Sequence, residues 1–138
     1  MKNVMLKIEG VQISADGEES IIEFMTEGKI YEKEKGTYIV YKESEICGMD
    51  GCTTTLKLFE GKISMKRFGT ANSEMVFEKG KKYKSNYATP YGNFDMEILT
   101  KKVSYEMSDE KKGSVYIEYA MDLQGMMQSK NALNISIM

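Results

Sequence analysis

Arg67 is the residue of this sequence with the most distinctive chemistry, because every other strongly basic residue is a lysine. Ile63, Met65 and Arg67 share one parity of an alternating segment, whereas Ser64 and Lys66 share the other. Successive side chains of a strand point to opposite faces, so an inward Ile63 and Met65 place the Arg67 guanidinium in the interior. A buried guanidinium needs either a protein carboxylate or the acid group of a ligand, since its desolvation is otherwise too costly.

Two tyrosines are the other candidate ligand-binding residues. Tyr119 lies in the clearest alternation of the chain, and Tyr41 lies in a segment, residues 38–41, that is apolar on both parities and whose inward face the pattern leaves open. A tyrosine hydroxyl that points into an interior needs a hydrogen-bond partner. We therefore expect Arg67, Tyr119 and Tyr41 to anchor a small amphipathic or anionic ligand, with an internal ion pair of Arg67 as the alternative.

Cys47 and Cys52 enclose four residues, and a hairpin loop there could bring the two thiols together. A reducing cytosol disfavours the disulfide, although redox-dependent pairing stays open. A structural zinc site needs about four ligands. Two cysteines in a chain without histidine could reach that number only with carboxylates or a second subunit. We interpret the pair as free loop thiols and expect no metal and no cofactor.

Paired carboxylates are the remaining candidates for acid–base catalysis. Glu43 and Glu45 are spaced to share one face of a strand, as are Asp95 and Glu97. Such spacing is typical of any solvated strand face. Histidine, the commonest general base, is absent from the sequence. We therefore predict that the protein is not an enzyme.

Composition and charge favour one globular domain and disfavour several kinds of partner. The apolar fraction of 41% supplies enough side chains for a core. A net charge of -2 lacks the basic excess that binding to nucleic acid requires. No apolar run approaches the about 20 residues that span a bilayer, and charged residues interrupt the first ten positions, unlike a secretion signal. We expect a cytoplasmic protein without nucleic-acid or membrane partners.

Alternation of apolar and polar residues runs through the whole chain and predicts strands rather than helices. Every second residue is apolar over residues 115–123. The alternation changes phase at Gly10, which predicts a β-bulge, and Gly28 interrupts the next segment in the same way. Another change of phase separates residues 94–98 from residues 103–107.

Three turn sequences, at residues 60–61, 79–82 and 89–92, predict hairpins between the segments that flank them. In the third turn, Pro90 favours the reversal and Tyr91 lies at the tip, where it could contact a partner. The strands number about nine or ten, and a sheet of that size protects its edges best by closing on itself. We predict an all-β fold: a single antiparallel meandering β-barrel of about 8–10 strands over residues 1–138.

Several segments, in a fixed order over nearly the whole chain, carry a family resemblance. They are residues 21–28 (IIEFMTEG), residues 51–57 (GCTTTLK), Arg67-x-Gly69, Ser73-x-Met75-x-Phe77-x-x-Gly80, residues 89–92 (TPYG), residues 113–119, and Asn131-x-Leu133-x-Ile135-x-Ile137. Through them the sequence resembles the YwiB-like family of uncharacterised bacterial proteins. The resemblance implies a calycin-type, lipocalin-like β-barrel, and it implies no activity because the family has none assigned.

Two functions compete at this point. The first is a non-enzymatic barrel that binds a small amphipathic or anionic molecule in its interior through Arg67 and inward tyrosines. The second is a structural or protein–protein interaction module, a homodimer, whose barrel is filled by its own side chains.

Overall fold

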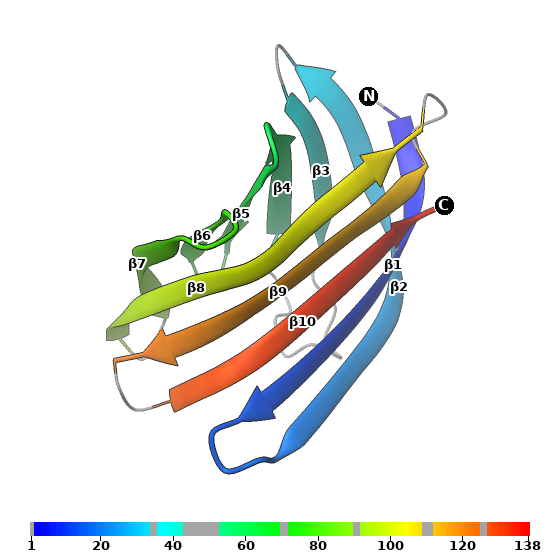
Figure 1. Cartoon of the computed structure of the whole chain (residues 1–138). Coiled ribbons are helices and arrows are strands. Elements are labelled where there is room, and N and C mark those ends of the chain that lie inside the picture. Colours follow the sequence, from blue (N-terminus) through cyan, green and yellow to red (C-terminus); the bar gives the residue numbers. More distant parts are fainter. Residues whose placement is uncertain are drawn as a thin grey trace.

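The computed structural model describes residues 2–33, 36–42, 53–69, 72–89, 92–108, 112–124 and 127–138, and within them the chain forms ten strands and no helix (Figure 1). The strands are β1 (Lys2–Ser14), β2 (Glu19–Lys33), β3 (Gly36–Lys42), β4 (Thr53–Phe59), β5 (Lys62–Phe68), β6 (Ser73–Phe77), β7 (Lys82–Thr89), β8 (Gly92–Met107), β9 (Gly113–Leu123) and β10 (Met127–Ile137). The all-β prediction is confirmed. The described residues contain no helix with the length and apolarity needed to cross a membrane.

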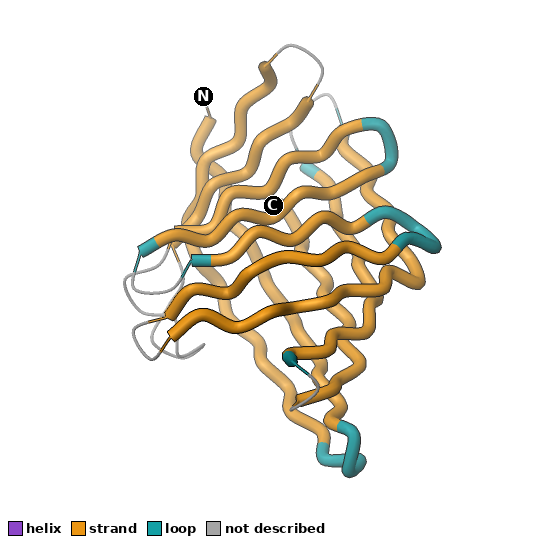
Figure 2. The backbone as a smooth tube through the Cα atoms, turned by 90° about the vertical axis from the view of Figure 1, so that its left-hand side faces the viewer, coloured by secondary structure: helices purple, strands orange, loops and turns teal. Residues whose placement is uncertain are grey.

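All ten strands belong to one antiparallel sheet, in the order β6-β5-β4-β3-β2-β1-β10-β9-β8-β7. The first and last strands pair in the middle of this order, so the edges of the sheet come from the middle of the chain. The sheet coils into a nearly closed barrel with β6 and β7 at its seam (Figures 1 and 2). The predicted meandering barrel is confirmed, with the ladder left open at one place.

The turn between β6 and β7 does not form the predicted hairpin. Among the described residues, β6 pairs only with β5 and β7 pairs only with β8. The turn itself joins the neighbouring ladder, since the Gly80 N–H donates to the Thr100 carbonyl at 2.9 Å and the Thr100 N–H donates to the Lys81 carbonyl at 3.2 Å. The prediction was wrong because glycine and lysines indicate a turn without indicating which strands pair across it. The other two predicted hairpins form, β4–β5 and β7–β8.

The predicted bulge at Gly10 is also wrong. Residues 6–14 pair with β10 without a change of register, so Gly10 and Gln12 stay on the inner face that begins with Val4 and Leu6. The apolar Val11 and Ile13, which suggested the change of phase, share the outward parity, and Ile13 is 39% exposed. Gly28 likewise causes no interruption, because it is buried on the same parity as Phe24 and Ile30.

The change of phase predicted between residues 94–98 and 103–107 is confirmed. The ladder between β8 and β9 shifts register between Thr100 and Lys102. The inward face of β3, which the sequence left open, carries Ile39 and Tyr41. On the outer face Tyr38 stacks on Tyr31 of β2, with ring centroids 5.0 Å apart.

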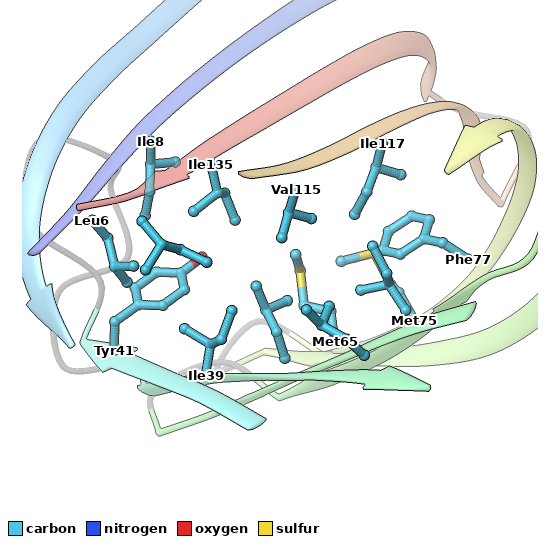
Figure 3. Packing of buried hydrophobic residues seen from close by; sticks show 14 of the residues in the cluster. Leu6, Ile8, Ile39, Tyr41, Met65, Met75, Phe77, Val115, Ile117 and Ile135 are labelled. Atoms are coloured by element: carbon cyan, nitrogen blue, oxygen red, sulfur yellow. The ribbon is translucent and has the colours of Figure 1, made fainter. Parts of the chain in front are cut away.

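Apolar side chains from β1 to β6 and from β8 to β10 fill much of the barrel (Figure 3). Leu6, Ile39, Val115 and Ile135 are among those that are fully or almost fully removed from solvent. Each such side chain stabilises the fold by about 1.5–3 kcal/mol relative to exposure. The barrel interior is therefore a packed core over much of its length rather than an open channel.

Several residues that the sequence singled out lie outside the described residues. They are Cys47 and Cys52, the carboxylates of Glu43 and Glu45, and Pro90 with Tyr91. The thiol and loop-tip predictions therefore stay predictions.

Gly28 of β2 lies between β1 and β3, with little room for a side chain. A Cβ there would lie 2.8 Å from Leu6 Cδ1 and 2.9 Å from the Val40 carbonyl oxygen, whereas a Cβ at Gly10 would meet nothing closer than 4.0 Å. We expect Gly28→Ala to lower the free energy of unfolding by about 1–3 kcal/mol in urea titrations, because the backbone oxygen cannot move aside cheaply.

Gly10→Ala is the matched control for that prediction. It should leave the free energy of unfolding unchanged or raise it by up to about 1 kcal/mol, through the lower entropy of the unfolded chain. Equal effects at the two positions would contradict the close packing of β2 between β1 and β3.

Candidate functional site

A row of polar side chains crosses the inner face of the sheet from β3 to β6. Tyr41 is the register partner of Thr54, Thr54 that of Arg67, and Arg67 that of Ser73. We call these four residues the arginine row. The adjacent row on the same strands, Ile39, Leu56, Met65 and Met75, is apolar and buried.

A second polar row crosses the inner face from β8 to β2. Thr100 pairs with Tyr119, Tyr119 with Asn131, Asn131 with Gln12, and Gln12 with Ser20. We call these five residues the amide row, after its two amide side chains. Each of the strands β8, β9, β10, β1 and β2 contributes one polar residue to this row of register partners. Together the two rows place polar groups around much of the inner wall of the barrel.

The two rows border a cavity of about 280 Å³. Its polar wall consists of Gln12, Ser20, Tyr41, Arg67, Ser73, Tyr119 and Asn131, and its apolar wall includes Ile8, Ile22, Phe24, Met75, Met96, Met121 and Leu133. Ile8, Tyr41 and Met75 belong both to the cavity wall and to the core shown in Figure 3. The cavity is therefore continuous with the apolar interior on one side and polar on the other.

The structure brings together the three residues that the sequence proposed as a site. Arg67, Tyr119 and Tyr41 come from β5, β9 and β3, and all three line this one cavity. The inward parity of Arg67 with Ile63 and Met65 is as expected, since both apolar residues are buried. Ligand binding by the three residues stays a prediction.

Arg67 gives the cavity its charge. Among the described residues that line the cavity, it is the one with a charged side chain, and none is an aspartate or a glutamate. Its Nε atom is buried, and the residue also interacts with other groups of the protein. A guanidinium presents its donors in a planar fork suited to a carboxylate or a phosphate.

Tyr119 lies beside that charge. Its ring packs against Phe77 of β6 with centroids 4.8 Å apart, so side chains of β9 and β6 meet across the interior. Burial raises the pKa of the Tyr119 hydroxyl above its usual value, and the nearby Arg67 charge acts in the opposite direction. The hydroxyl is accordingly neutral at physiological pH and available as a hydrogen-bond donor next to the guanidinium.

The carboxylates of Asp95 and Glu97 take no part in this cavity. They lie on the outer parity of β8, and Glu97 forms an ion pair with Lys82 at 3.5 Å between Oε1 and Nζ. Their interpretation as a solvated strand face is confirmed. No cluster of three or more Cys, Asp or Glu side chains suited to a metal ion occurs among the described residues.

The amide row is the part of the site that the sequence did not reveal. Gln12 shares the inward parity of Leu6 and Ile8, but the bulge predicted at Gly10 assigned it to the outer face. The polar residue recurring at one level of each strand was the available signal. It becomes visible only when the strand registers are known.

Comparisons with known proteins place the chain in a family. Residues 6–135 match the model of a domain of unknown function (DUF1934). The chain belongs to this family. It is 30% identical over 109 residues to the uncharacterized beta-barrel protein YwiB of Bacillus subtilis, covering 79% of this chain and 75% of the relative. The crystal structure of the Bacillus subtilis ywiB protein superimposes with a TM-score of 0.85 at 26% identity, covering 98% of this chain and 89% of that one. The resemblance to the YwiB-like family is confirmed, and so is the barrel.

The placement of Tyr119 beside Arg67 predicts a pKa change. In Arg67→Met the pKa of Tyr119 should rise further, because the cation that opposes the effect of burial is lost. The titration is followed by the ultraviolet absorbance of tyrosinate, and subtraction of the same variant carrying Tyr119→Phe isolates this residue from the other tyrosines.

Lys66→Met removes a positive charge from the outer face of the same strand and should leave the pKa of Tyr119 unchanged. An unaltered Tyr119 titration in Arg67→Met would contradict the proximity of the two side chains.

Proposed function

We propose that this protein, whose biochemical function is unknown, binds a small amphipathic acid inside the barrel. The observation that carries the proposal is a cavity whose described wall contains a guanidinium, two tyrosines and many apolar side chains but no aspartate or glutamate. Arg67 binds the acid group, Tyr119 and Tyr41 lie beside it, and the apolar wall surrounds the remainder of the ligand.

The charge of Arg67 favours an anion over a neutral or cationic ligand. Charge-assisted hydrogen bonds are shorter and stronger than neutral ones, and a guanidinium forms two in parallel with one carboxylate. In an interior of low effective dielectric this attraction is larger than at the surface. A cationic ligand would face repulsion from the same group.

The dimensions and lining of the cavity favour a small ligand with an apolar portion. Its volume of about 280 Å³ lies just below the roughly 300–1,000 Å³ typical of ligand pockets. Met75, Met96 and Met121 line it, and unbranched thioether side chains adapt to ligands of differing shape. The proposal involves no reaction, cofactor, nucleic acid or membrane, and it assumes the cytoplasmic location expected from the sequence.

Calorimetric titration with nonanoate, nonanol and nonylammonium tests this function. Wild-type protein should bind nonanoate most tightly. Arg67→Met should weaken nonanoate binding by about 1.5–3 kcal/mol, the contribution of a hydrogen bond to a charged group, and leave nonanol binding unchanged. Lys66→Met, which removes a charge outside the cavity, should bind nonanoate as the wild type does.

The same Arg67 variant separates a ligand anchor from an internal ion pair. An anchor in a hydrated cavity predicts a small change in the free energy of unfolding of the free protein. A buried ion pair predicts a loss of about 3–5 kcal/mol, because the partner carboxylate is stranded. Equal affinity of wild type and Arg67→Met for nonanoate would refute the proposed function.

A second candidate function, homodimer formation, is favoured by apolar side chains on the outer face of β1 and β2. Ile21 is 67% exposed and Met25 58% exposed, and Ile13 and Met5 lie on the same face. Analytical ultracentrifugation should show a dimer that the double variant Ile21→Lys, Met25→Lys dissociates. A wild-type monomer at all concentrations would eliminate this candidate.

A further inference from the structure

The amide row faces the same cavity as Arg67, from another part of the barrel wall. Gln12 lies on β1 and Asn131 on β10, whereas Arg67 lies on β5, with β4, β3 and β2 between β5 and β1 in the sheet. In a ten-stranded barrel this separation places the amides nearly across the lumen from the guanidinium. A single ligand that filled this cavity of about 280 Å³ would contact both walls.

On one side of the amide row, the inner face of β1 and β10 still carries Ser14 and Ser129. Toward the packed core, the polar character of this wall ends at the amide row. The next row on the same strands consists of Ile22, Gly10, Leu133, Ile117 and Val103, which present no polar side chain. A cavity that binds a plain alkyl chain is expected to have apolar side chains at the level of the amide row as well. Instead, the adjacent level carries two amides and a serine that line the cavity.

Amide side chains in such a place demand hydrogen bonds. The Asn131 amide donates from Nδ2 to Ser129 Oγ at 3.0 Å, which orients the side chain and uses one of its two N–H groups. A methyl or methylene group pressed against Gln12 and Asn131 would remove water from these polar groups without replacing its hydrogen bonds, and affinity would fall. A hydroxyl or amide on the ligand would replace those bonds.

We propose that the ligand is a small organic acid with a second hydrogen-bonding group, a hydroxyl or primary amide, which the amide row binds while Arg67 binds the acid. The inference rests on the proposed function and adds the chemical class of the ligand. Arg67 makes the cavity prefer acids over neutral ligands. Gln12 and Asn131 make it prefer acids with a second hydrogen-bonding group over plain alkyl acids. A plain fatty acid is then a weak ligand rather than the natural one.

Two matched pairs of acids test this inference by calorimetry: ω-hydroxyhexanoate against heptanoate, and ω-hydroxyoctanoate against nonanoate. The members of a pair have the same number of heavy atoms and differ in a terminal hydroxyl or methyl group. Non-specific apolar binding favours the methyl member. We expect wild-type protein to bind the hydroxy acid about tenfold more tightly in at least one pair, the effect of one satisfied hydrogen bond.

The double variant Gln12→Leu, Asn131→Leu should reverse that preference and bind the methyl acids at least as tightly as wild type does. Gln128→Leu, which changes an exposed amide on the outer face of β10, should preserve it. The wild-type comparison decides the question even if the double variant does not fold.

The outcomes separate this inference from the proposed function. If wild type binds the methyl acids through Arg67 and shows no preference for the hydroxy acids, the amide row has no role in recognition and the inference is overturned, while the proposed function stands. If wild type binds none of the four acids, the proposed function fails and this inference fails with it.

Discussion

The backbone pairing of the first strand with the last is the interaction on which the rest of this structure depends. β1 to β6 form one meander and β7 to β10 another, and the described strands β6 and β7 do not pair. The β1–β10 ladder, from Leu6 opposite Ile137 to Ser14 opposite Ser129, therefore joins the two halves. It also builds the cavity, because Arg67 comes from the first half and Tyr119 from the second. Gln12 and Asn131 are partners within this ladder itself.

Two opposing demands meet inside such a barrel. Apolar burial stabilises the fold, and the row from Ile39 to Met75 meets that demand fully. Polar groups at the next level, including Arg67 and Gln12, are unfavourable in a closed core unless protein groups, water or a ligand complete their hydrogen bonds. The fold tolerates them where the packed core gives way to the cavity. Their presence at one level of both halves of the sheet is more simply explained by recognition than by stability.

The sequence predicted the features that depend on local alternation and missed those that depend on pairing. Residues 115–123 and the Arg67 segment alternate cleanly, and the structure places their side chains as expected. The open edge beside β6 could not be predicted, because the residues around Gly80 specify a turn and not its ladder. Gln12 was assigned to the wrong face because Val11 and Ile13, two apolar residues on the outward parity, resembled core positions. Two outward apolar residues in alternation give the same sequence pattern as a bulge, and only the strand register distinguishes the two structures.

A crystal structure of the protein with ω-hydroxyoctanoate tests the central claim, that the interior cavity is a recognition site oriented by Arg67, most directly. The account predicts the carboxylate within about 2.7–3.2 Å of the Arg67 guanidinium, at hydrogen-bonding distance, and the chain in the cavity that Tyr119 and Met75 line. The hydroxyl should lie against Gln12 or Asn131. A cavity closed by the protein's own side chains, with the acid absent or bound on the outer face, would contradict it.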